Sequence, residues 1–311
     1  MKSPILFIVG PTASGKSKLA LELARLLDGE ILSADSMQVY RGMNIGTAKP
    51  SRRDQQTVRH HLIDIVSPSR PFSAFHYRKL ALQKIREIME RGKIPIVSGG
   101  SGLYVRALQQ GFSGQPGPSA ACRRRLALAA RKNGVPWLHD KLRKMDFVTA
   151  NKIDVQDKKR IIRALEIHKL SGRKVSDWYG KRETLNDLGF ESIAIGITKD
   201  RQGLYEEINK RVDRMFRRGF VREVQKLERG KFSKTAAQAV GYKEIRSALK
   251  GQMSLEAAKE LIKRNTRRLA KRQMTWFKRE PGIEWIAWPR DEDVQKLAEK
   301  IADKVMAGAE R

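Results

Sequence analysis

The sequence predicts an α/β fold in which helices flank a parallel β-sheet and an all-helical segment interrupts the sheet domain. Apolar runs of strand length alternate with helical patterns in both halves of the chain, which is typical of parallel sheets. Between these halves, the stretch 114–189 has helical patterns but no run of strand character. We therefore expect an α/β core of residues 1–113 and 190–311 and an inserted helical subdomain of residues 114–189.

The first predicted strand, at residues 5–9, leads directly into a glycine-rich loop. This phosphate loop fits the pattern GxxxxGK[ST] and consists of Gly10, Pro11, Thr12, Ala13, Ser14, Gly15, Lys16 and Ser17. A strand, a glycine turn and a helix in this order direct backbone N–H groups and the positive end of a helix dipole at a polyphosphate. Lys16 would reach the terminal phosphates and Ser17 would bind Mg²⁺. The motif predicts a P-loop NTPase-like sheet; the alternative is a glycine turn that only connects two elements.

The remaining elements follow from hydrophobic periodicity. Leucines and alanines recur at helical spacing between Leu19 and Leu27, and Asp28-Gly29 ends that helix. We further expect strands at 30–33, 94–97, 191–197 and 284–288, a helix at about 74–91, and helices from Gly203 onward.

Polar residues follow two of these strands. Asp35 comes just after strand 30–33, at the carboxyl edge where open α/β sheets bind ligands. A positioned aspartate can accept a proton from an attacking nucleophile, although aspartate is also common in turns and helix caps. The second glycine turn, residues 99–102, follows strand 94–97 and gives a weaker signal for the same edge.

The charge of the chain is its unusual compositional feature. Of 311 residues, 64 are Lys or Arg and 34 are Asp or Glu, a net charge of +30. Such an excess attracts polyanions, so nucleic acid is the leading expected partner and an anionic membrane surface a distant second. A basic but merely solvated surface is the alternative. Residues 1–4 run directly into the first strand and no apolar run is long enough to span a bilayer, so we expect a cytoplasmic protein. No obligate protein partner is evident from the sequence, and we expect a monomer.

The sequence offers no thiolate or histidine cage for a metal. Cys122 is the single cysteine, and His60-His61 lacks the spacing of a zinc site, so we interpret the histidines as a structural or surface pair. The metal we expect is Mg²⁺, held through Ser17, phosphates and water.

Two basic stretches have helical spacing. In residues 157–166, the pattern predicts Ile162 and Leu165 inward and Lys159 and Arg163 on a ridge that can meet phosphates. In residues 255–279, six cations recur, and their mutual repulsion is a reason to expect a bound anion, with a solvated face as the alternative: Lys263, Arg264, Arg267, Arg268, Lys271 and Arg272. Beside them, we expect Trp276 and Phe277 to be core anchors.

Taken in order, these motifs resemble those of the tRNA dimethylallyltransferase (tRNA isopentenyltransferase) family. The match is collinear over nearly the whole chain, which makes it far more specific than any single motif. The matching stretches are 10–17, 35–43, 46–50, 60–64, 99–104, 160–166, 211–213, 241–244 and 270–273.

The resemblance implies transfer of a dimethylallyl group from its diphosphate to N6 of adenosine 37 in tRNAs that read codons beginning with U. It implies that Asp35 is the general base, and that Thr12 and Arg211 stabilise the diphosphate. It further implies that the inserted subdomain binds tRNA and that the protein recognises the anticodon stem-loop. The residues implied to contact tRNA are Asp35, Ser36, Met37, Gln38, Ser101, Arg123, Lys159, Arg160, Ile161, Ile162 and Arg163.

The chain departs from the family pattern at a few positions. Asp154, Val155 and Gln156 stand where the family has His-Pro-Asn, and Arg59 replaces a usual proline. Ser101 replaces a usual threonine and keeps its hydroxyl.

Three other functions fit parts of the pattern. The phosphate loop would equally serve a kinase, which should turn over ATP without tRNA. A related adenylate isopentenyltransferase would act on a free nucleotide, but the charge of +30 and the basic insertion speak against so small an acceptor. An RNA-binding regulator could keep the loop for structure alone, and its RNA function would survive replacement of Asp35.

Overall fold

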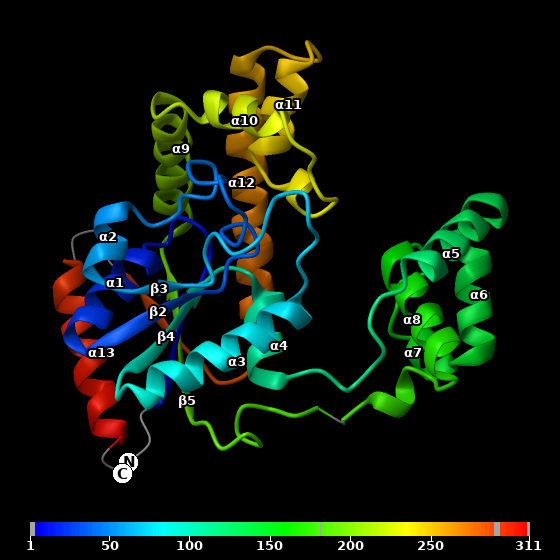
Figure 1. Cartoon of the computed structure of the whole chain (residues 1–311), viewed down its shortest axis with the longest axis horizontal. Coiled ribbons are helices and arrows are strands. Elements are labelled where there is room, and N and C mark those ends of the chain that lie inside the picture. Colours follow the sequence, from blue (N-terminus) through cyan, green and yellow to red (C-terminus); the bar gives the residue numbers. More distant parts are fainter. Residues whose placement is uncertain (1–3, 181, 289–292, 310–311) are drawn as a thin grey trace. The chain divides into compact units, whose positions relative to one another are not determined.

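The computed structural model describes residues 4–180, 182–288 and 293–309, and it divides into two compact units (Figure 1). Unit 1 comprises Met1–Gln109 and Leu185–Arg311, and unit 2 comprises Gln110–Thr184. The observed boundaries are thus 110 and 184, where the sequence predicted 114 and 189. The chain leaves and re-enters unit 1 at adjacent points, because the Leu185 N–H donates a hydrogen bond of 2.9 Å to the Gln109 carbonyl.

Unit 1 is organised around a parallel sheet. Its strand order is β3-β2-β4-β1-β5-β6, and every pairing among the described residues is parallel. The central strand β1 is fully buried, as its apolar sequence requires. These features confirm the predicted α/β class. The strands are β1 (Ile5–Val9), β2 (Gly29–Ser33), β3 (His60–His61), β4 (Ile94–Gly99), β5 (Ser192–Thr198) and β6 (Ile283–Ala287).

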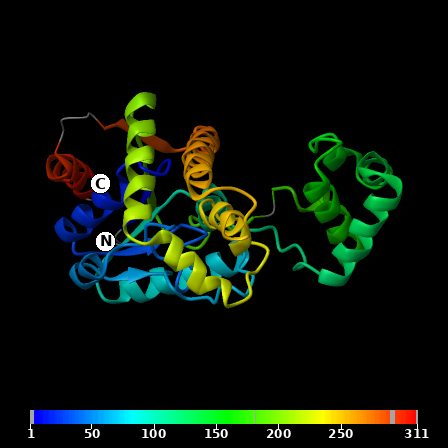
Figure 2. The same ribbon diagram turned by 90° about the horizontal axis from the view of Figure 1, so that it is seen from above.

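Helices cover both faces of the sheet (Figure 2). Helices α1 (Lys16–Leu26) and α13 (Val294–Ala309) pack on one face around Leu6, Ile8 and other buried strand residues. Helix α3 (Ala74–Glu90) covers the other. The connection from β1 to β2, which contains α1, and the connection from β3 to β4, which contains α3, run across the sheet in opposite directions. Because such connections between parallel strands are right-handed, the two helices lie on opposite faces of the sheet.

Further helices of unit 1 gather beside the carboxyl ends of the strands (Figure 1). The long helix α12 packs against α9 and α11, and Ala13 of the phosphate loop packs against Leu204 and Ala270 from α9 and α12. This places two long helices directly over the phosphate loop. The remaining elements of unit 1 are α2 (Arg52–Thr57), α4 (Gly102–Gln110), α9 (Arg201–Arg217), α10 (Phe220–Glu228), the 3₁₀ turn η2 (Ala236–Gln238), α11 (Tyr242–Leu249) and α12 (Leu255–Phe277).

Unit 2 contains helices and no strand in its described residues. Its core includes Leu126, Leu138, Leu142 and Ile161, with the free thiol of Cys122 buried among them. A hydrophobic core of its own is what allows such an insertion to form a compact unit. The helices are α5 (Ala120–Asn133), α6 (Val135–Met145), α7 (Phe147–Ala150) and α8 (Lys158–Ser171), followed by the 3₁₀ turn η1 (Ser176–Trp178).

The histidine pair forms an element that the periodicity did not predict. His60 and His61 make the short edge strand β3, and the imidazole of His61 contacts the buried carboxylate of Glu30 at 2.6 Å. Arg91 donates to the same carboxylate at 2.7 Å. The pair therefore forms one edge of the sheet. The part of the chain that the structure describes holds no cluster of three His, Cys, Asp or Glu residues. None of the described helices has both the length and the apolarity that crossing a membrane requires.

Candidate active site

A cavity of about 750 Å³ lies in unit 1 at the carboxyl ends of β1, β2 and β4. The phosphate loop, the segment after β2, the turn after β4, and helices α9, α11 and α12 all contribute to its walls. A second cavity of about 430 Å³ adjoins it. Both cavities are lined by Lys16, Ser17, Gln38, Ala48, Ser98, Arg211 and Met215.

The phosphate loop needs its two outer glycines. Gly10 has a φ of 148°, and a Cβ atom there would lie 2.4 Å from the Ile197 carbonyl oxygen. Gly15 has a φ of 97°, and its Cβ would lie 2.5 Å from the ring of Trp288. Both positions combine a conformation that favours glycine with a close neighbour that leaves no room for a side chain, the Ile197 backbone at Gly10 and the Trp288 ring at Gly15. Because α1 begins at Lys16, the N–H groups of its first turn and the positive end of its dipole lie at this loop.

Three charged side chains interact at the cavity. Burial and the neighbouring Arg211 lower the pKa of Lys16 to about 8, while the charge of Asp35 opposes that effect. Burial also lowers the pKa of Arg211, and Asp35 again acts in the opposite direction. Two cations and one carboxylate thus share a partly buried site, which leaves it with an excess of positive charge suited to an anion.

Asp35 is both a turn residue and a cavity wall. Its Oδ1 accepts hydrogen bonds from the N–H groups of Met37 at 2.8 Å and Gln38 at 3.4 Å. Both bonds end on one oxygen, so the turn orients the carboxylate without using Oδ2. The two interpretations of Asp35 that the sequence left open are therefore compatible in one geometry.

Ser101 fixes the next residue of this segment. The Ser101 hydroxyl accepts a hydrogen bond of 2.9 Å from the Ser36 N–H and donates to the Ser36 hydroxyl at 3.2 Å. The turn after β4 and the segment after β2, which the sequence placed at one edge, are thus joined.

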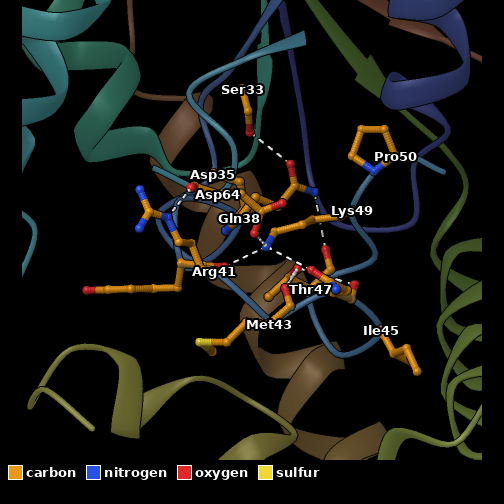
Figure 3. A network of polar contacts seen from close by, with 12 residues as sticks. Ser33, Asp35, Gln38, Arg41, Met43, Ile45, Thr47, Lys49, Pro50 and Asp64 are labelled. Carbon is orange, nitrogen blue, oxygen red and sulfur yellow. Dashed lines mark hydrogen bonds and ion pairs between the residues drawn. The ribbon is translucent and has the colours of Figure 1, made fainter. Parts of the chain in front are cut away.

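The side-chain amide of Gln38 has a fixed orientation (Figure 3). Its Nε2 donates to the carbonyls of Thr47 at 3.2 Å and Ala48 at 3.3 Å, and its Oε1 accepts from Ser33 at 2.8 Å. Because a carbonyl can only accept, the amide nitrogen must face Thr47 and Ala48. Gln38 therefore lines the cavity in a single amide orientation.

The loop that holds Gln38 is anchored from two sides. The ammonium of Lys49, whose side chain is 3% exposed, donates to the Tyr40 carbonyl and to Asp64 at 2.5 Å each (Figure 3). On the other side, the Glu223 carboxylate accepts from three consecutive N–H groups, those of residues 44–46, at 2.8–3.2 Å. Such a nest of N–H groups favours an anion, which here is an internal carboxylate.

The glycine turn after β4 reflects close packing on several sides. A Cβ on Gly99 would lie 2.2 Å from the Ala34 carbonyl oxygen. A Cβ on Gly100 would lie 2.4 Å from Nε2 of Gln273, and one on Gly102 would lie 2.2 Å from the ring of Trp276. The glycines of this turn thus have a structural reason. Helix α12 approaches Gly100 and Gly102 so closely that side chains at these positions would collide with it.

Gln273 and Trp276 are cavity residues that the sequence did not predict as such. They lie three residues apart on α12, a spacing that places them on one face of the helix. Trp276 was expected in the core; instead its ring lines the cavity, with the Arg106 guanidinium 4.4 Å from the ring centroid. Its neighbour Phe277 is fully buried, as expected. The signals for these residues in the sequence were Gly100 and Gly102, which face them, and the family resemblance over residues 270–273.

The cations of the predicted ridge of unit 2 differ in exposure and in their partners, and Arg160 pairs with Asp157 at 3.4 Å. Lys159 and Arg160 are exposed on α8. Arg163 donates to Glu166 and to the Pro116 carbonyl, each at 2.7 Å, and Arg123 donates to the same Glu166 carboxylate.

The prediction of Leu165 as an inward residue of this segment is confirmed, whereas the prediction of Ile162 is wrong. Ile161 is fully buried in the core of unit 2, whereas Ile162, which was expected inward, is only partly buried. The Ile161 side chain, one of the expected tRNA contacts, therefore has no exposed surface.

The predicted ridge of α12 is also reduced. Lys263 pairs with Asp213 at 3.1 Å and with Glu260 at 2.9 Å, and Arg267 donates to Asn209 at 2.7 Å. These internal partners relieve part of the repulsion that the sequence suggested. The cations of the ridge that remain exposed are Arg264, Arg268, Lys271 and Arg272.

The parallel sheet, the phosphate loop and the charged cavity at its edge define an α/β protein of the phosphate-loop class. The family model described as IPP transferase matches residues 38–280. A tRNA dimethylallyltransferase of Pelotomaculum thermopropionicum is 45% identical over 305 residues, covering 97% of this chain and 96% of that protein. One of Geobacter sulfurreducens is 45% identical over 294 residues, covering 94% of each.

Solved structures give the same result. A tRNA isopentenylpyrophosphate transferase of Bacillus halodurans is 40% identical, with a TM-score of 0.72 and 99% of each chain covered. A eukaryotic dimethylallyltransferase described as acting on tRNA is 27% identical, with a TM-score of 0.83, covering 98% of this chain and 80% of that one. The chain belongs to the tRNA dimethylallyltransferase, or IPP transferase, family.

Proposed function

We propose that the protein transfers the dimethylallyl group of dimethylallyl diphosphate to the exocyclic N6 of adenosine 37 in tRNAs that read codons beginning with U. The observation that supports this most is that a single cavity is lined by Lys16 and Arg211 together with the Asp35 carboxylate. Cations at a phosphate loop suit the diphosphate, and a carboxylate held by its other oxygen suits an amine that must lose a proton.

The reaction asks three things of the protein. An adenine amine is a poor nucleophile and is inaccessible in a stacked loop, so the base must be extruded and its proton removed as the bond forms. In the proposed step, N6 forms a bond to the allylic carbon, the bond from that carbon to the diphosphate oxygen breaks, and the N6 proton passes to Asp35. Thr12, Lys16 and Arg211 then stabilise the charge on the departing pyrophosphate.

Mg²⁺ fits the residues that are present. The Ser17 hydroxyl, at the start of α1, lines both cavities, and the described residues provide no further protein cage around it. We expect Mg²⁺ to be held by Ser17, the diphosphate and water, where it would supply positive charge to the leaving group.

The tRNA contacts fall on both units. Around the extruded base, we propose Ser36, Met37, Gln38 and Ser101, all of which line the cavity. On unit 2, we propose that Lys159 and Arg160 contact backbone phosphates, with Arg123 and Arg163 in the positions set by Glu166. We expect the protein to work as a cytoplasmic monomer on the anticodon stem-loop.

The proposal is tested by mass analysis of tRNA digested after incubation with the protein, Mg²⁺ and dimethylallyl diphosphate. A gain of one dimethylallyl group on the adenosine next to the anticodon is the expected result. A kinase would instead turn over ATP without tRNA, and an adenylate isopentenyltransferase would modify free nucleotide. Binding of tRNA with no mass gain would favour an RNA-binding regulator.

A further inference from the structure

We propose that Gln273 is a positioning residue that ties the phosphate loop to the turn after β4 and thereby sets the position of Thr12 during transfer. The inference rests on the proposed function, since it concerns how the part of the cavity that would bind the diphosphate is positioned relative to the part that would bind the acceptor base. Gln273 itself lines that cavity and lies on helix α12, far along the chain from both segments that it joins.

One side-chain amide makes both connections. Gln273 Oε1 accepts a hydrogen bond of 2.8 Å from the Thr12 N–H, and its Nε2 donates to the Gly100 carbonyl at 2.9 Å. The Thr12 N–H can only donate and the Gly100 carbonyl can only accept, so the bridging group must offer an acceptor and a donor side by side. Of the two closest substitutes in size, glutamate lacks the donor and methionine lacks both groups.

The phosphate loop needs such a restraint at this point. Ala13, next to Thr12, has a φ of 65°, in the left-handed region that a residue with a Cβ atom seldom adopts. A strained conformation of this kind persists only where its surroundings hold it. Packing against Leu204, Ile208 and Ala270 holds the Ala13 side chain, and the Gln273 bond holds the backbone one residue earlier.

The other end of the bridge is close to both subsites. Gly100 is followed by Ser101, whose hydroxyl binds Ser36, next to Asp35. The lack of a side chain at Gly100 is what admits Gln273, because a Cβ there would lie 2.4 Å from Nε2. Gln273 thus joins the loop that carries Thr12 to the turn that fixes the segment of the general base.

The test compares Gln273→Met with the wild-type protein in single-turnover transfer from labelled dimethylallyl diphosphate to tRNA. Methionine keeps the length of the side chain and removes both hydrogen bonds. We expect the rate at saturating substrate to fall about 10- to 100-fold, the scale of a misplaced reacting group, with tRNA affinity changed less than about twofold. Thr275→Val, on the exposed side of the same helix, is the matched control and should keep the wild-type rate.

A double-mutant cycle with Thr12→Ala separates positioning from a general structural role. If Gln273 acts through Thr12, Gln273→Met should slow the Thr12→Ala protein far less than it slows the wild type. Additive effects on the logarithm of the rate, or a wild-type rate in Gln273→Met, would overturn the inference. Gly100→Ala, which should displace the same amide, serves as a second variant with the same expected cycle if Gln273→Met does not fold.

Failure of the proposed function gives a different result. In that case the wild-type protein itself forms no dimethylallyl-tRNA, and both proposals are wrong. Hydrogen exchange supplies a readout that does not depend on activity: the Thr12 amide should be protected in the wild type and exchange faster in Gln273→Met. Equal protection in the two proteins would contradict the bridge.

Discussion

Asp35 and Arg211 line the same cavity, where burial lowers the pKa of Arg211 and the charge of Asp35 acts against that effect. The two residues come from different parts of unit 1, the segment after β2 and helix α9. The opposite charges of the two side chains therefore act on each other at the cavity before any substrate binds. This suits a reaction in which one group takes a proton while the other meets a leaving anion.

Asp35→Asn should lower the single-turnover rate about 100-fold or more, the scale of positioned acid–base catalysis. Asparagine keeps an Oδ1 acceptor for the Met37 N–H, so the turn after β2 should persist and tRNA affinity should be unchanged. Rapid-quench measurement of transfer, together with a tRNA-binding assay, checks both parts. An unchanged rate would remove Asp35 from the role of general base.

Lys159→Ala and Arg163→Ala should have different effects on tRNA binding. Lys159 is exposed, so its loss should weaken binding and reduce the slope of log affinity against log salt by about one phosphate contact. Arg163 is engaged by Glu166 and Pro116, so its loss should mainly lower the thermal stability of unit 2. Binding titrations at several salt concentrations, with Lys296→Ala on α13 as control, measure the slopes. Equal slopes for Lys159→Ala and the wild type would exclude a backbone contact by Lys159.

Glu166→Gln should make unit 2 less stable at neutral pH and less sensitive to acid. Burial of Glu166 acts to raise its pKa, but hydrogen bonds from Arg123, Arg163 and the Ser119 N–H outweigh it, so the pKa lies below its ordinary value of 4.5. A carboxylate with a lowered pKa contributes stability above pH 4.5 that is lost as the pH falls through its folded-state pKa.

We therefore expect Glu166→Gln to cost about 1–3 kcal/mol at pH 7, the usual loss for a disrupted buried hydrogen-bond network, and less at pH 3–4. Denaturant unfolding followed across this pH range measures the difference. A difference that stays constant with pH would show that the ionised form of Glu166 is not what stabilises the unit.

Gly99→Ala should damage the site without removing any functional group. Its Cβ would lie 2.2 Å from the Ala34 carbonyl oxygen, so the backbone next to Asp35 must move. Overpacking of this kind costs about 1–3 kcal/mol, and turnover should fall with it. Gly117→Ala is the matched control, because nothing lies within 4 Å of its Cβ; it should change the free energy of unfolding by less than about 0.5 kcal/mol. Similar melting temperatures for the two variants would contradict the expected collision.

The sequence predicted the parts of the fold that depend on local patterns. The apolar run of β1 followed by the phosphate loop, and the position of Asp35 after β2, were visible because strand, turn and ligand edge are neighbours in the chain. Arg211 had no such local context and came only from the family resemblance. Its proximity to Lys16 and Asp35 is a tertiary contact that periodicity does not encode.

Other features could not be predicted, because the segment was too short to show a pattern or because the residues in contact are far apart in the sequence. Strand β3 contains two residues, fewer than any alternation can mark. The neighbouring isoleucines 161 and 162 are both compatible with a helical stripe, and only the packing of unit 2 decides which is buried. The Gln273–Thr12 hydrogen bond joins residues separated by 261 positions, a separation over which no local pattern in the sequence could indicate it.

The hydrogen bond between Leu185 and Gln109 holds together the two points at which unit 2 is inserted into unit 1. Because the insertion begins and ends at neighbouring points, the sheet does not constrain how long the insertion is or which residues it contains. A short turn in place of residues 110–184 should bridge the gap and leave unit 1 able to fold by itself. A different insertion could accordingly replace unit 2 while the walls of the cavity, all of which come from unit 1, stay the same.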